Sequence, residues 1–137
     1  MLTPVIALIL WTFVIEIGLY ATRIPAMRAA RIDPRRVKRK DDIDALPVAV
    51  KQVADNFSHL HEQPMVFYVL AICTQLAGLS DPTNVALAWI YVALRIVHSI
   101  VQCTWNFVPV RFTVFVVSSL VLLGLALRDF VHVLLHA

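Results

Sequence analysis

The sequence predicts an all-α integral membrane protein, built as one bundle of four transmembrane helices over residues 1–137. Three observations lead to this prediction. Hydrophobic residues make up 60% of the chain and charged residues only 15%, whereas a soluble domain carries about 25% charged residues. Nine of the twelve Lys and Arg residues lie between Arg23 and Lys51. The apolar residues gather in segments close to the ~20 residues that cross a hydrocarbon core.

The first transmembrane helix is expected over about residues 2–22. Residues 2–20 are nearly all apolar, and Glu16 is their single charge. No Lys or Arg precedes this stretch, and no convincing small-x-small cleavage site separates it from Arg23. These features favour a retained membrane helix over a cleaved signal peptide. The basic stretch 23–51 contains several aspartates and prolines, so we expect an exposed loop there.

The second helix is expected over about 47–79, and its character changes midway. Residues 48–63 are amphipathic and residues 64–79 are apolar. The helix should therefore start in the interfacial layer and enter the membrane near Glu62. Pro64 is expected to kink it, because proline removes a backbone N–H and crowds the preceding turn. A tight turn follows at Gly78–Pro82.

The third and fourth helices are expected over about 83–105 and 109–135. Four crossings place both termini on one side and the basic loop 23–51 on the other. Because cytoplasmic loops carry an excess of Lys and Arg, we expect that loop in the cytoplasm and the termini in the periplasm or lumen. A loop beside anionic lipid explains the basic charge better than nucleic-acid binding does.

Polar residues within the apolar segments are candidate site residues, because they are expensive in a membrane and need partners. Tyr91, Arg95, His98 and Gln102 are spaced four, three and four residues apart, so they share one face of a helix. Arg111 and Glu62 should lie near the same end of the bundle. A second polar face collects Gln52, Asn56, His59 and Gln63. The pattern predicts one polar pocket in the cytoplasmic half, suited to an anionic ligand that carries an amine.

A structural interpretation of the same residues stays open at this point. Arg95 could pair with Glu16 or Glu62 to fasten helices, and His98 could be a hydrogen-bonded interior histidine. No metal site is predicted, because His132 and His136 lie at the end of the chain with only Asp129 near them.

Three stretches resemble the MAPEG family, the membrane-associated proteins of eicosanoid and glutathione metabolism. They are NFSHLHEQPMVFY (56–68), AWIYVALRIVHS (88–99) and PVRF (109–112). The resemblance looks closest to the bacterial, largely uncharacterised branch, which implies a bacterial inner membrane. It also implies a homotrimer that binds glutathione between subunits.

The resemblance implies a role for each candidate residue. Glu62 would hold the amino group of glutathione, Arg95 and His98 would line its site, and Arg111 would stabilise the thiolate. Asn56, His59 and Gln102 complete the expected cofactor-binding set. The implied activity is a glutathione-dependent transferase or peroxidase acting on a lipophilic electrophile. The alternative is a non-catalytic scaffold or lipid-binding subunit of the same fold.

This chain departs from the family pattern at three places. The family motif of the second helix is Asn-x-x-Glu-x-x-Pro, but here His59 stands three residues before Glu62, and Pro64 follows after two. Gln102 stands where relatives that use glutathione often have tyrosine, and Phe115 likewise lacks a hydroxyl. The departures favour the non-catalytic alternative, whereas Arg95, His98 and Arg111 favour the enzyme.

Overall fold

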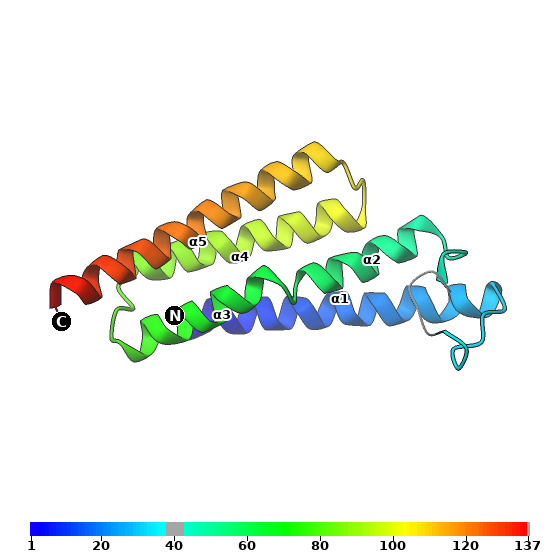
Figure 1. Ribbon diagram of the computed structural model, residues 1–137, viewed down its shortest axis with the longest axis horizontal. Helices are drawn as coiled ribbons and strands as arrows, with labels where there is room; N and C mark the ends of the chain where they lie inside the picture. Colours follow the sequence, from blue (N-terminus) through cyan, green and yellow to red (C-terminus); the bar gives the residue numbers. More distant parts are fainter. Residues whose placement is uncertain (38–42, 137) are drawn as a thin grey trace.

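The computed structural model describes residues 1–37 and 43–136, except for the side chain of His136. Its helices are α1 (Leu2–Ala29), α2 (Val48–His59), α3 (Gln63–Leu76), α4 (Pro82–Cys103) and α5 (Val108–His136). In Figure 1, α4 and α5 run side by side as a hairpin, while α2 and α3 follow one another along α1. Both ends of the chain lie at the same end of the bundle (Figure 1). The prediction of an all-α bundle of four helical segments is confirmed. We call each of these segments a leg, and α2 and α3 together form the second leg.

Three of these helices have the length and composition of membrane spans. They are α1, α4 and the Val108–Leu135 part of α5. The chain is therefore an integral membrane protein with several membrane-capable helices. Helix α3, with 14 residues, is shorter than a full span on its own.

Helix α1 is longer than the sequence analysis predicted, since it continues through Pro25 to Ala29 instead of ending near residue 22. Alanine, methionine and arginine are strong helix formers and fill most of this extension. Arg28 lies in the last turn, where a cation complements the helix dipole. The prediction of an exposed loop over 23–51 is thus wrong at both ends, because Lys51 belongs to α2. Residues 38–42 of that loop lie outside the described residues.

The second leg is interrupted instead of being one kinked helix over 47–79. Helix α2 ends at His59 and α3 starts at Gln63, with Glu62 at φ −94° and ψ −95° between them. Pro64 explains the interruption, because its ring would clash with the carbonyl of Leu60 in a continuous helix, yet fits the first turn of a new one. The His61 ring bonds the Phe57 carbonyl through Nδ1 at 2.8 Å, so a side chain satisfies a backbone group beside the break.

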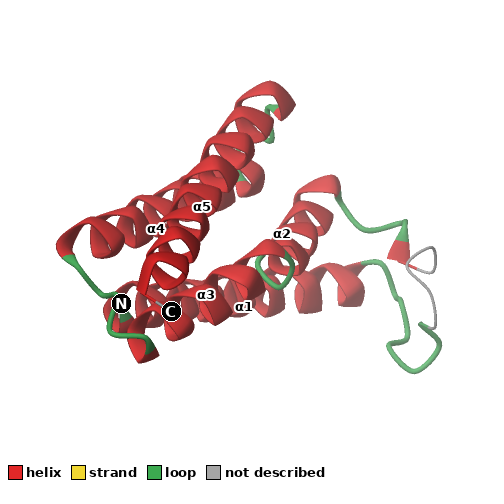
Figure 2. Ribbon diagram, turned by 60° about the vertical axis from the view of Figure 1, so that its left-hand side comes forward, coloured by secondary structure: helices red, strands yellow, loops and turns green. Residues whose placement is uncertain are grey.

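The polar stripe of α4 faces the interior, as predicted. Tyr91, Arg95, His98 and Gln102 are each at most 5% exposed. Tyr91 also stacks on Phe67 of α3 with ring centroids 4.6 Å apart. Toward the end with the 104–107 connection, the α4–α5 pair diverges from the α1–α2 pair (Figures 1 and 2).

The α3–α4 connection is the tight turn expected at Gly78–Pro82. Gly78 adopts φ 72°, and the Leu79 N–H bonds the Thr74 carbonyl at 2.9 Å. A positive φ at this position closes α3 with a Schellman motif, which glycine adopts without strain. Asp81 then caps α4 by accepting the Asn84 N–H at 2.7 Å.

Candidate functional site

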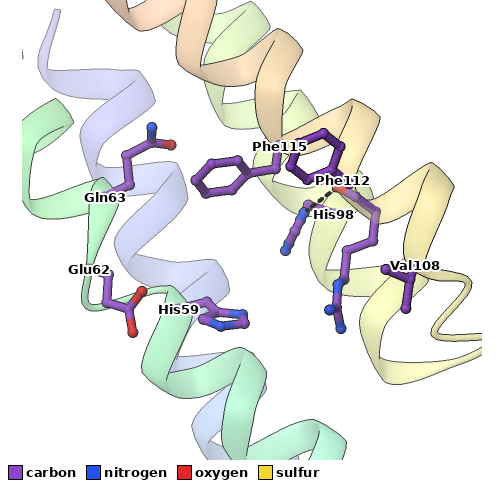
Figure 3. A pocket seen from close by; sticks show the side chains of 8 residues that line it. His59, Glu62, Gln63, His98, Val108, Phe112 and Phe115 are labelled. Atoms are coloured by element: carbon purple, nitrogen blue, oxygen red, sulfur yellow. Dashed lines mark hydrogen bonds between the residues drawn. The ribbon is translucent and has the colours of Figure 1, made fainter.

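A cavity of about 300 Å³ lies where the α2–α3 break faces α4 and the start of α5. We call it the break pocket. Its lining residues are His59, Glu62, Gln63, His98, Val108, Arg111, Phe112 and Phe115. In Figure 3, His59, Glu62 and Gln63 come from one wall, and His98 and Phe115 face them from the other. Both walls combine polar and aromatic groups, so the pocket can hold a ligand with charged and apolar parts.

His98 joins α4 to the first turn of α5. Its Nδ1 lies 3.2 Å from the carbonyl oxygen of Arg111 (dashed in Figure 3). A carbonyl only accepts, so Nδ1 carries the proton and donates it. In the neutral ring Nε2 is then an acceptor, and Nε2 is buried with no partner in the described part of the chain.

Arg111 is held at the pocket by the α4–α5 connection. Its Nη1 donates to the side-chain oxygen of Asn106 at 2.6 Å. Asn106 has φ 46°, a conformation that asparagine tolerates better than most residues. The guanidinium forms no ion pair with any described carboxylate, so its charge is available to a ligand.

Glu62 lies at the N-terminus of α3 and brings the only carboxylate of the pocket lining. Among the described residues it forms no ion pair with Arg95 or Arg111. Glu16 instead accepts a hydrogen bond from the Tyr20 hydroxyl at 3.1 Å. Within the described part of the chain, Arg95 therefore pairs with neither Glu16 nor Glu62, contrary to the structural alternative.

Arg95 lies behind the pocket wall and is only 2% exposed. Its Nε donates to the Tyr91 hydroxyl at 3.2 Å. Its Cζ lies 4.9 Å from the ring centroid of Phe115, which lines the pocket. The guanidinium thus rests on aromatic faces, and its positive charge lies just beneath the pocket surface. Its Nη2 has no partner in the described part of the chain.

The remaining candidate residues either line the pocket or lie behind its lining. His59 lines the pocket and donates from Nδ1 to the Gln102 side-chain oxygen at 3.1 Å. Asn56 donates to the Cys103 sulfur at 3.4 Å. Neither Asn56 nor Gln102 lines the cavity. The structure therefore brings Glu62, His59, His98 and Arg111 to the pocket, and it places Arg95, Asn56 and Gln102 behind it.

Several buried polar atoms around the pocket lack a partner within the described residues. They are Asn56 Oδ1, Gln63 Oε1, Arg95 Nη2, His98 Nε2 and Ser99 Oγ. An unsatisfied buried polar group costs about 1–3 kcal/mol, so such a concentration marks a place where water or a ligand completes the bonding. Donors and acceptors both occur in the set.

The apolar wall of the pocket, formed by Val108 and Phe112, was not predicted from the sequence, and no contact was predicted for Phe115. The signal was present in the spacing of α5, where Val108 and Phe112, and likewise Arg111 and Phe115, are four residues apart and share a face. Gln63 was placed on a polar face, and the structure shows it donating to Ser119 at 2.7 Å.

No cluster of three or more metal-ligating side chains occurs among the described residues. The pair His132 and His136 falls partly outside them, because the side chain of His136 is not described.

The MAPEG family model matches residues 1–131. No curated protein and no solved structure gave a match. The family match covers nearly the whole chain but gives no support to a bacterial branch. Many members of the family depend on glutathione. With four helical legs, membrane-capable helices and a family match of this extent, the chain belongs to the MAPEG family.

Proposed function

We propose that the break pocket binds glutathione and uses it in a transferase or peroxidase reaction on lipophilic electrophiles. The observation that carries this proposal is that Glu62 and Arg111 line one pocket without pairing to each other. Glutathione carries one ammonium group and two carboxylates, which complement one carboxylate and two guanidinium groups. The unpartnered donors and acceptors around the pocket fit such a ligand.

Each residue has a distinct part in this proposal. Glu62 holds the ammonium group, while Arg95 beneath the wall supplies positive potential for a carboxylate. Arg111 supplies the cation that stabilises the thiolate, because a positive group beside a thiol lowers its pKa. His98 Nε2 accepts a hydrogen bond from the ligand. When bound, glutathione supplies the sulfur nucleophile of the reaction.

The apolar wall of the pocket suits a substrate that arrives from the bilayer. Val108, Phe112 and Phe115 form this wall on α5. Helix α5 is apolar enough to contact lipid along most of its length. We propose entry between the helices, followed by attack at the end where Arg111 lies.

The assembly and orientation are also part of the proposal. His61 and Glu62 are exposed on the single chain, and contact with lipid would be costly for them. A homotrimer that covers this surface, as the family resemblance implies, removes the cost. We place the basic loop in the cytoplasm and both termini across the membrane from it.

One observation favours the non-catalytic alternative, a scaffold or lipid-binding subunit. The residues that line the break pocket include no hydroxyl and no thiol. A hydroxyl donor beside the sulfur would be a second means of stabilising a thiolate. In its absence, Arg111 must provide that stabilisation alone.

The test is glutathione binding and turnover of an aryl halide by the detergent-purified protein. Arg111→Ala should lower kcat by about 10²-fold, as the loss of one transition-state donor does in other enzymes. Glu62→Ala should raise the KM for glutathione by about tenfold with a smaller change in kcat. Arg128→Ala is the matched control, since it removes an arginine from the same helix at the far end of the bundle.

Two results would overturn parts of the proposal. An absence of both glutathione binding and turnover in the wild type would support the non-catalytic alternative. Equal turnover in the wild type and Arg111→Ala would leave an enzyme in which Arg111 has no role in activating the thiol.

A further inference from the structure

A second cavity, of about 460 Å³, lies at the opposite end of the bundle. It is bounded by the α3–α4 turn and by the last turns of α5, which reach the same end in Figure 1. We call it the turn cavity. Its lining includes the polar residues Asp81, Asn84, Arg128 and Asp129 and the apolar residues Val131 and Leu135. None of these residues belongs to the break pocket.

Asp129 brings a buried carboxyl group to the turn cavity, with 8% of its surface exposed. One carboxylate oxygen accepts from the Asn84 amide at 2.8 Å, and the other shares the single Thr74 hydroxyl proton with the Leu70 carbonyl. These bonds tie α3, α4 and α5 together. Both donors are neutral, whereas an ionised carboxylate has about four acceptor sites and a charge to compensate. The carboxylate therefore retains capacity for a cationic donor.

The adjacent arginine is directed away from this carboxylate. Arg128 pairs with Asp81, the residue that caps α4. The Asn84 N–H and then the Arg128 guanidinium hold the pKa of Asp81 below its ordinary value, so Asp81 stays ionised at neutral pH. The cavity thus presents two carboxylates and one guanidinium, and His132 adds a ring to its wall.

Asn84 provides an independent sign that the turn cavity takes a ligand. The residue lines the cavity and is only 3% exposed. Its Nδ2 donates to Asp129 and to the Leu79 carbonyl, but its Oδ1 has no partner within the described residues. A buried amide oxygen beside a buried carboxylate makes this region rich in acceptors. A primary ammonium, with three donors and no acceptor, is the group that complements it.

The position of the turn cavity indicates that the ammonium belongs to a lipid. The turn over residues 77–81 joins α3 to the start of a membrane-capable helix, and the ends of helices that span a bilayer lie at the level of the lipid headgroups. Val131 and Leu135, which are 52% and 75% exposed, extend an apolar surface from the cavity. A ligand bound here would meet a carboxylate and a guanidinium at one end and aliphatic side chains at the other.

We propose that the turn cavity binds the headgroup of an ethanolamine phospholipid. Asp129 and Asn84 accept the ammonium, and Arg128 donates to the phosphate at the rim. The acyl chains follow Val131 and Leu135 along α5. The three methyl groups of a choline headgroup would remove the N–H donors, and a glycerol headgroup has no positive charge, so both should bind more weakly.

Native mass spectrometry of the full chain in detergent tests this proposal. The protein is titrated with ethanolamine, choline and glycerol phospholipids that share the same acyl chains. We expect the wild type to bind the ethanolamine lipid about tenfold more tightly than the choline lipid. Asp129→Asn, which keeps the shape but removes the charge, should abolish this preference. Glu16→Gln is the matched control, since it neutralises a carboxylate in α1 and should leave the preference intact.

A wild type that binds the three lipids equally would overturn the proposal, and so would an unchanged preference in Asp129→Asn. Should Asp129→Asn fail to fold, Val131→Trp fills the cavity wall without touching the hydrogen bonds of Asp129. It should lower the affinity for the ethanolamine lipid, and unchanged affinity would count against the site. Glutathione binding should be the same in these variants, which separates this proposal from that for the break pocket.

Discussion

The two ends of the bundle satisfy their buried polar side chains to different degrees. At the turn cavity, Asp129 is bonded to two other helices, and the adjoining turn is closed by Gly78 and capped by Asp81. At the break pocket, Arg95 and His98 are buried with unpartnered nitrogens. Since hydrogen-bonded buried groups stabilise and orphaned ones destabilise, the Asp129 bonds hold the helices together at the first end, where Asn84 Oδ1 is still open to a ligand, and the second end keeps more of its bonding capacity for a ligand.

The interrupted second leg explains how one end gains that capacity. A continuous helix through residues 60–62 would not have placed Glu62 at a helix N-terminus. The break at residues 60–62 instead lets Glu62 start a new helix and line the pocket with His59. Departures from regular structure at such a place are typical of functional sites.

The largest effect is expected when the Asp129 carboxyl group of the turn cavity is removed, which tests the difference between the two ends most directly. Asp129→Ala would take the acceptor away from Asn84 and one of two acceptors away from Thr74, and we expect a loss of about 2 kcal/mol in the free energy of unfolding. Denaturation of the detergent-solubilised protein measures it. Glu16→Ala is the control, because the only described hydrogen bond of Glu16 is to Tyr20 within its own helix. Equal losses in both variants would show that the Asp129 hydrogen bonds do not hold the helices.

The complementary change is made at the break pocket. Arg95→Met replaces a buried guanidinium by an apolar side chain of similar length, and an isolated buried charge contributes little or negatively to stability. We expect the free energy of unfolding to stay within about 1 kcal/mol of the wild type, while glutathione affinity falls by about tenfold. The same denaturation assay and a binding titration check both. A loss of stability larger than that of Asp129→Ala would reverse the assignment of the two ends.

The sequence predicted the interior face of α4 because helical spacing alone puts Arg95 and His98 on one stripe. It also predicted that His59, Glu62 and Arg111 would converge, since topology brings their segments to one end of the bundle. The pocket itself could not be predicted at this level. Whether Arg95 lines it or lies behind Phe115 depends on side-chain packing, which spacing does not determine.

The turn cavity was missed for a different reason. Asp129 lies near the end of the chain, where it was considered from the sequence only as a neighbour of His132 and His136. Thr74 and Asn84 are small polar residues that carry no charge signal. Only the close approach of α3, α4 and α5 shows that these three residues form one hydrogen-bonded unit.

The smallest expected effect is the pH dependence of the stability that Asp81 contributes at the surface of the turn cavity. The Asn84 N–H and Arg128 hold the pKa of Asp81 below its ordinary value of 3.8. A carboxyl group with a lower pKa in the folded state contributes stability that is present above 3.8 and lost as pH falls through the folded-state value. The wild type should therefore lose this contribution on acidification from about pH 5.

Asp81→Asn keeps a cap on α4 but cannot titrate, so its unfolding midpoint should fall less over the same range. Thermal unfolding of both proteins across that range measures the difference. Parallel pH profiles would show that the Asp81–Arg128 pair adds nothing to the stability of this end, and that the buried bonds of Asp129 hold it without help from the surface.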